Sequence, residues 1–204
     1  MEQILPGLYE WTAMRETIHQ PVHSAYVVPA RTLIDPMVPT EGLAAFDGLA
    51  QPERIVLTNR HHVRHSAPFV ARFGCTVACN AAGLWDLADA PVPVRGFEFG
   101  DEVAPGIVAE KVGTLTPEET ALHIALGSGA LAFADSLVRE GGTGPLAFVP
   151  HWLMGNDPEA VRSGLLEAFQ RLIDEVDFDV LLLAHGAPWV GGGKRALQEF
   201  VATQ

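Results

Sequence analysis

The stretch LTNRHHVRHSAPFVARFG, Leu57 to Gly74, places three histidines and two arginines within six residues. Histidines at this density are typical of a metal site, because neutral imidazole is a common metal ligand. Arginine is a fixed cation, so it cannot bind a metal and it repels one nearby. Further on, Phe69, Val70 and Phe73 recur at helical spacing and Gly74 is suited to end a helix. The stretch therefore predicts a histidine-bearing loop that leads into a helix.

The segments around this stretch indicate strands. RIVLTN (54–59) is a short continuous apolar run, as expected of a strand covered on both faces, and CTVACN (75–80) follows as another strand. ALHIAL (121–126) and ALAFAD (130–135) flank the turn GSG and are typical of a β-hairpin. Taken alone, TPEE (116–119) has the features of a helix start, but the alternating pattern after it favours a strand.

Helices are predicted mainly in the last quarter of the chain. Residues 156–176 have Asp at the N-cap, Pro at the first helical position and an apolar face. A buried strand at 179–186 and a short helix at 191–204 follow, and an earlier short helix at 40–50 has Thr40 as its expected cap. This order of elements predicts an α/β layered domain whose helices cover the outer faces of the sheets.

Composition and charge restrict the class of protein. The chain has 204 residues, 48% of them hydrophobic and 19% charged, which predicts a single domain over residues 1–204. A net charge of -12 argues against nucleic acid or an anionic membrane surface as a partner. The start MEQILPGLYEW has no basic region typical of a secretory signal, and no apolar run reaches membrane-spanning length. We therefore expect a cytoplasmic protein with a small-molecule partner; the sequence does not indicate its oligomeric state.

The two cysteines, Cys75 and Cys79, are predicted to be buried reduced thiols. They are four residues apart on an expected strand and so share one face. That separation is too long for a disulfide, and two thiols alone do not complete a tetrahedral zinc site.

Several segments together resemble the metallo-β-lactamase fold superfamily of metal-dependent hydrolases. The resemblance implies a four-layer αββα sandwich of two mixed β-sheets flanked by helices, and a metal-dependent site at strand ends. The third of these segments resembles the strand, loop and helix that carry the signature H-x-H-x-D-H, the fourth ends near a metal-bridging aspartate, and the fifth ends in a histidine ligand. In chain order the segments are ILPGLYEW (4–11), AYVVPARTLIDP (25–36), IVLTNRHHVRHSAPFVARFG (55–74), LAFADSL (131–137) and VLLLAHGAP (180–188).

The start of the helix sets the frame of the signature. It makes His65 the final histidine and His62 the middle one, with Arg60 in place of the first histidine and Arg64 in place of the aspartate. Shifting the frame by one residue does not restore the motif. A further family histidine is also missing, since Thr114 or Leu115 stands there in VGTLTPEE. The ligands that the resemblance retains are His62, His65, Asp135 and His185.

These residues are enough for one metal ion and not for two. The second site of the family keeps three ligands, and three protein ligands with one open position are typical of catalytic zinc. The expected cofactor is therefore one divalent metal ion, zinc or iron, or none. His61 is an alternative to Arg60 as a ligand.

The arginines allow two interpretations. Arg60 is expected to pair with Asp135 where the first metal would lie, and Arg60 and Arg64 are candidates to bind an anionic substrate group, together with His151 at the pocket mouth. The first function hypothesis is a hydrolase with an at most mononuclear site and a small substrate. The alternative is a catalytically inactive protein of the same fold that binds a small anion or a protein partner, with Arg60 and Arg64 replacing the metal charge.

Overall fold

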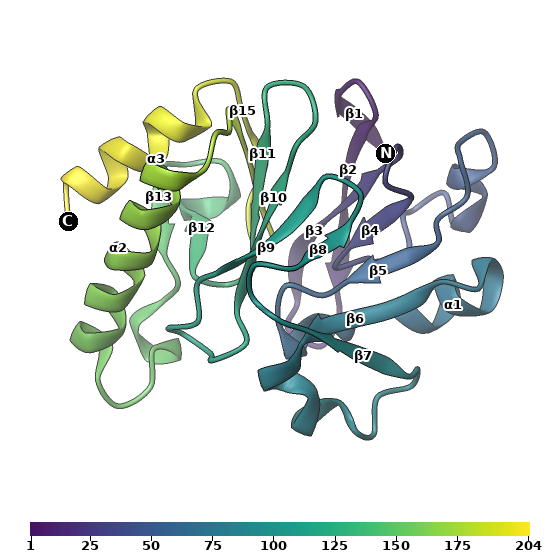
Figure 1. The fold of residues 1–204 in the computed structure, drawn as a ribbon, viewed down its shortest axis with the longest axis horizontal. Coiled ribbons are helices and arrows are strands. Elements are labelled where there is room, and N and C mark those ends of the chain that lie inside the picture. The colour runs from purple at the N-terminus through teal and green to yellow at the C-terminus, as the bar shows by residue number, and fades with distance from the viewer.

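Two mixed β-sheets lie face to face in the computed structural model, which describes residues 1–204 (Figure 1). The N-terminal sheet has the strand order β1-β2-β3-β4-β5-β6-β7, antiparallel from β1 to β4 and parallel from β4 to β7. Its strands are β1 (Glu2–Leu5), β2 (Leu8–Arg15), β3 (Gln20–Val27), β4 (Thr32–Ile34), β5 (Arg54–Val56), β6 (Thr76–Asn80) and β7 (Val94–Phe97).

The C-terminal sheet has the order β15-β14-β11-β10-β9-β8, in which only β11 and β14 are parallel neighbours. A separate two-stranded sheet pairs β12 with β13. The bounds are β8 (Glu102–Ala104), β9 (Ile107–Lys111), β10 (Thr120–Ile124), β11 (Ala130–Phe133), β12 (Leu137–Arg139), β13 (Leu146–Phe148), β14 (Val180–Leu183) and β15 (Trp189–Val190).

Helices cover the outer faces of both sheets, α1 on the N-terminal side and α2 and α3 on the C-terminal side (Figure 1). Asp157 caps α2 by accepting a hydrogen bond from the backbone N–H of Ala160, and Gly74 ends α1 in the left-handed conformation. The helical elements are α1 (Ser66–Phe73), α2 (Pro158–Glu175), α3 (Gly193–Ala202) and the 3-10 segments η1 (Leu43–Phe46), η2 (Arg60–Val63), η3 (Ala81–Leu87), η4 (Glu140–Gly142) and η5 (His151–Leu153). None of the helices combines the length and the apolar character that a membrane span needs.

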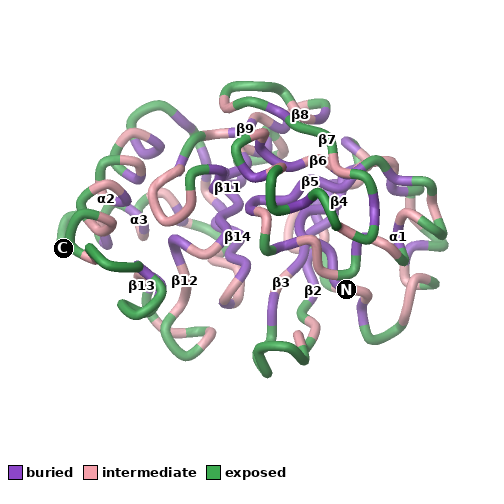
Figure 2. The backbone as a smooth tube through the Cα atoms, turned by 90° about the horizontal axis from the view of Figure 1, so that it is seen from below, coloured by how far each residue is buried: buried purple, intermediate pink, exposed green.

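Three separate hydrophobic cores correspond to the three interfaces between four layers. The core between the sheets includes Leu8 and Leu122, the core under α2 and α3 includes Phe169, and the core under α1 includes Ile55 and Phe69. In Figure 2 the strands at the centre are buried, while the loops and the outer sides of the helices are exposed. The predicted αββα sandwich is confirmed.

One local prediction differs from the structure, and two agree. The segment 40–50 forms only the 3-10 turn η1, whose N-cap is Gly42 and not Thr40. Residues 116–119 form no helix but a turn that leads directly into β10 at Thr120, in agreement with the strand pattern that follows them. Cys75 and Cys79 are free and buried, as expected.

Candidate metal centre

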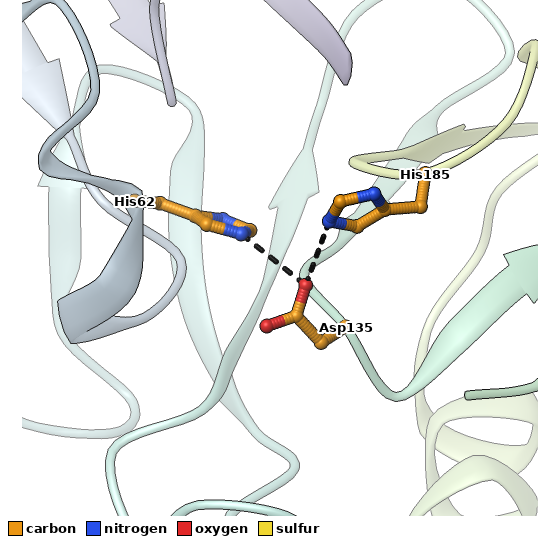
Figure 3. A group of neighbouring side chains, drawn as sticks. All are labelled: His62, Asp135 and His185. Carbon is orange, nitrogen blue, oxygen red and sulfur yellow. Dashed lines mark ion pairs between the residues drawn. The ribbon is translucent and has the colours of Figure 1, made fainter. Parts of the chain in front are cut away.

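Three side chains from two sheets meet at one point, and Figure 3 shows all three pointing toward one another. His62 lies in η2, just after β5, whereas Asp135 and His185 each lie two residues beyond the ends of the parallel strands β11 and β14. The register pairs Phe133 with Leu183, so the two strands deliver Asp135 and His185 to the same level. The parallel register therefore explains how residues fifty positions apart along the chain come to share one site.

The donor atoms are spaced as ligands of one metal ion would be. Asp135 Oδ1 lies 3.2 Å from His62 Nε2 and 3.1 Å from His185 Nε2. A tetrahedral zinc ion with ligands at about 2.0–2.1 Å holds neighbouring donor atoms about 3.3 Å apart. All three donors lie within 4.8 Å of one another. The two imidazole nitrogens and one carboxylate oxygen therefore fit a zinc or iron ion in both chemistry and spacing.

His62 is held from behind by a buried carboxylate. Its Nδ1 lies 2.9 Å from Asp35 Oδ2 and 3.1 Å from the hydroxyl of Thr58. Thr58 also donates its backbone N–H and its hydroxyl to Asp35. A carboxylate that accepts the Nδ1 proton of a histidine fixes its ring and directs the Nε2 lone pair outward, as is typical of metal sites. Asp35 therefore orients His62 toward Asp135.

Asp135 is held by an amide as well as by the two histidines. Asn59 is fully buried and donates from Nδ2 to Asp135 Oδ2 at 2.8 Å, while Asn59 Oδ1 accepts from the backbone N–H of His61. This contact occupies Asp135 Oδ2 and leaves Asp135 Oδ1 between His62 and His185. The side chains of Asp135 and His185 are 22% and 24% exposed, so solvent reaches the centre from their side.

The charges of the cluster stabilise one another. Burial alone would raise the pKa of Asp135, but His62 and His185 outweigh it and hold the pKa of Asp135 well below its usual range. Burial and Arg64 oppose the charge on His62, but Asp35 and Asp135 overcome both and raise the pKa of His62. The pKa of Asp35 is lowered, since His62, Arg64 and Thr58 together outweigh its burial. The two carboxylates therefore favour the protonated form of His62, and His62 in turn favours the charged form of both carboxylates.

No protein-family model and no curated protein sequence matches the chain. The structure is similar to a metallo-β-lactamase from Erythrobacter litoralis with beta-mercaptoethanol in its active site, with a TM-score of 0.70 and 16% identity over 100% of this chain and 96% of that one. It is also similar to the metallo-beta-lactamase family protein TTHA1429 from Thermus thermophilus, with a TM-score of 0.69 and 17% identity over 98% and 80% of the two chains. The chain has the metallo-β-lactamase fold. TTHA1623, solved in a di-iron-bound form, has a TM-score of 0.60 and 26% identity over 92% and 91% of the two chains.

The cluster contains three of the four ligands that the metallo-β-lactamase resemblance retains. His62, Asp135 and His185 are together, whereas His65 stands at the N-cap of α1, is exposed, and accepts a hydrogen bond at Nδ1 from the backbone N–H of Val38. His61 is also exposed and lies outside the cluster.

Arg60 does not pair with Asp135, so this expectation was wrong. Its guanidinium binds Glu118 at 2.5 Å and Asp86 at 3.2 Å and lies over the ring of Trp85. Glu118 is fully buried and needs a cation more than Asp135 does, since Asp135 already has two histidines and an amide. Arg60 is therefore engaged beside the cluster and not within it.

Arg64 lies behind the cluster. Its Nη1 donates to the backbone carbonyls of His23 and Asp35 at 2.6 and 2.8 Å, and its Nε and Nη2 are buried without partners. A φ of 43° and a ψ of -124° put Arg64 in a strained backbone conformation between η2 and α1. Its charge interacts with Asp35 and Asp135 from the interior of the protein. Because its guanidinium nitrogens are buried, a substrate does not reach Arg64 in this conformation.

His151 lies elsewhere, in η5, where it borders a separate hollow described below.

Four residues outside the set predicted from the sequence shape this centre. Asp35, Thr58 and Asn59 hold the ligands in place, and the fourth is Glu119, in the loop before β10. Glu119 is fully buried; it accepts from the backbone N–H of Ser136 at 2.8 Å, and its Oε2 has no partner. Burial, and then the charge of Asp135, raise the pKa of Glu119 to about 7. The turn thus places a buried acid close enough to Asp135 for their charges to interact.

Proposed function

We propose that the protein is a metal-dependent hydrolase that binds one divalent metal ion, zinc or iron, through His62, Asp135 and His185, and acts on a small substrate. The observation that carries this proposal is the convergence of these three donors with Asp35 placed behind His62. A residue selected only for packing does not need a buried carboxylate to orient its ring. Two similar structures, a metallo-β-lactamase and a di-iron protein, support the same chemistry.

The chain's own residues prepare the centre for such a metal. When bound, the metal acts as a Lewis acid on a carbonyl or phosphoryl oxygen and lowers the pKa of a coordinated water. Asp35 keeps a proton on His62 Nδ1, so that Nε2 faces the metal position, and Asn59 keeps Asp135 Oδ1 turned toward both histidines. The partial exposure of Asp135 and His185 supplies the open side that a substrate needs.

Part of the predicted substrate recognition has little support in this geometry. Arg60 is bound to two carboxylates and Arg64 is buried against backbone carbonyls. An anionic substrate would have to displace Asp86 from Arg60, since Asp86 is the more exposed of its two acidic partners. We therefore propose a small substrate and assign no charge to it.

The alternative is a metal-free protein of the same fold that binds a small anion or a protein partner. The observation in its favour is the position of His62 between Asp35 and Asp135, which raises the pKa of His62, with the Arg64 guanidinium as a cation beside them. Here His62 and Arg64, and not Arg60, would replace the metal charge.

Metal analysis separates the two functions. The purified protein, supplied with zinc, iron or manganese and then desalted, should retain about one ion per chain. His185→Ala should lose that ion, whereas His65→Ala, which removes a histidine outside the cluster, should keep it. An absence of stoichiometric metal in the unmodified protein would end the hydrolase proposal. Retention by His185→Ala, or loss by His65→Ala, would show that the metal is held by other residues.

A further inference from the structure

A hollow of about 310 Å³ lies between β13, η5, α2 and α3, and it shares no residue with the metal cluster. Its apolar wall includes Leu146, Phe148 and Phe200. Phe148 packs edge-on against Phe200, with ring centroids 4.9 Å apart, so this wall is firmly supported from the core under α2 and α3. The polar side chains at the hollow include His151 and Arg162.

Arg162 is a cation without a partner in a strongly acidic chain. It forms no ion pair and no hydrogen bond, although the chain carries 25 acidic residues against 13 lysines and arginines. Its Nε is buried, and its guanidinium lies 5.5 Å from the centre of the Phe148 ring. Arginine has five N–H donors in a planar fork that matches a carboxylate. An unpaired guanidinium on an aromatic wall is suited to bind an anion that also has an apolar part.

We propose that this hollow binds a small monocarboxylate with an apolar chain. The carboxylate accepts hydrogen bonds from Arg162, and the chain lies against Phe148 and Phe200. His151 borders the same hollow, so its predicted role in ligand binding belongs here and not to the metal centre.

The volume sets the size of the ligand. The hollow has a volume of about 310 Å³. This lies at the lower end of the range for small-molecule sites, about 300–1,000 Å³. Octanoate, with eight carbons and two oxygens, is therefore a suitable probe, and 1-octanol is the matched probe without the charge.

The test is a titration of the full chain with octanoate, followed by the backbone amide and Trp indole signals in ¹H–¹⁵N NMR spectra. We expect saturable binding with shifts centred on residues 146–152, and at least about tenfold weaker binding by 1-octanol. Arg162→Gln should weaken octanoate binding by about tenfold or more. Arg195→Gln, which removes the same charge from an exposed position on α3, should leave it unchanged.

Several results would overturn the proposal. These are equal affinity for octanoate and 1-octanol, unchanged octanoate affinity in a folded Arg162→Gln variant, or shifts centred on the metal cluster. If Arg162→Gln does not fold, the comparison of the two probes on the unmodified protein decides, together with the map of the shifts. Because the two sites share no residue, His185→Ala should bind octanoate normally, so the fate of the hydrolase proposal does not affect this one.

Discussion

Glu119 should make the stability of the protein fall as the pH rises toward neutrality. Its pKa in the folded protein is about 7, against an ordinary value of 4.5. Below pH 4.5 the group is protonated in both states and costs nothing. Between about pH 4.5 and 7 the unfolded chain releases the proton while the folded protein retains it, so stability decreases; above pH 7 the loss is complete. At 1.36 kcal/mol for each tenfold change in proton affinity, the total is about 3 kcal/mol.

The variant Glu119→Gln isolates this effect. Glutamine cannot ionise, but its side-chain oxygen can still accept the hydrogen bond from the backbone N–H of Ser136. The free energy of unfolding of both proteins is measured by urea denaturation from pH 4 to pH 8, with a chelator present so that metal does not contribute.

The free energy of unfolding of the variant, minus that of the unmodified protein, should be about 3 kcal/mol larger at pH 8 than at pH 4. Glu167→Gln, at an exposed position on α2, is the control and should show no comparable change. A difference between Glu119→Gln and the unmodified protein that stays constant from pH 4 to pH 8 would refute the argument.

Three other substitutions test the site and the core. Asp35→Asn should weaken zinc affinity about 10- to 100-fold, because it disturbs the contact that orients His62; competition with a chromophoric chelator measures this, and unchanged affinity would contradict the role of Asp35. Gly129→Ala should lower the free energy of unfolding by more than about 2 kcal/mol, since φ is 79° and a Cβ would lie 2.4 Å from the carbonyl oxygen of Asp177. A melting temperature equal to that of the unmodified protein would show that the backbone at Asp177 moves aside at little cost. Phe169→Ala should cost about 3–5 kcal/mol in urea denaturation through the cavity it leaves under α2, and a loss below about 1 kcal/mol would mean that the core refills.

The layered fold was predictable because its strongest signals are local. Buried strands such as β5 and β14 are continuous apolar runs, and α2 begins with an Asp–Pro pair at its N-cap and first position. The pairing of Asp135 with His185 was also accessible through the resemblance, since each follows a buried strand and the strands are parallel neighbours. In such cases a short-range pattern determines the position of the side chain.

The histidine loop was less predictable because its backbone is irregular. η2 is interrupted at His62, and Arg64 has a positive φ, so the spacing of residues does not determine where each imidazole points. This is why His62 enters the cluster while His65 turns to Val38.

Glu119 did leave a signal in the sequence. The segment TPEE combines a helix start with a strand pattern, and conflicts of this kind tend to occur at functional or strained sites. The structure resolves the conflict as a tight turn that buries both glutamates, Glu118 on Arg60 and Glu119 near Asp135. Burial of this kind depends on the opposite sheet, which no local window of sequence contains.

The centre takes His62 and Asp35 from the N-terminal sheet, and Asp135 and His185 from the C-terminal sheet. Neither half of the chain can therefore assemble it alone, and the centre forms only when the two halves have folded and docked. A bound ion would link the two sheets through its ligands and would slow their separation. The occupancy of the centre then reports on whether the two sheets are docked.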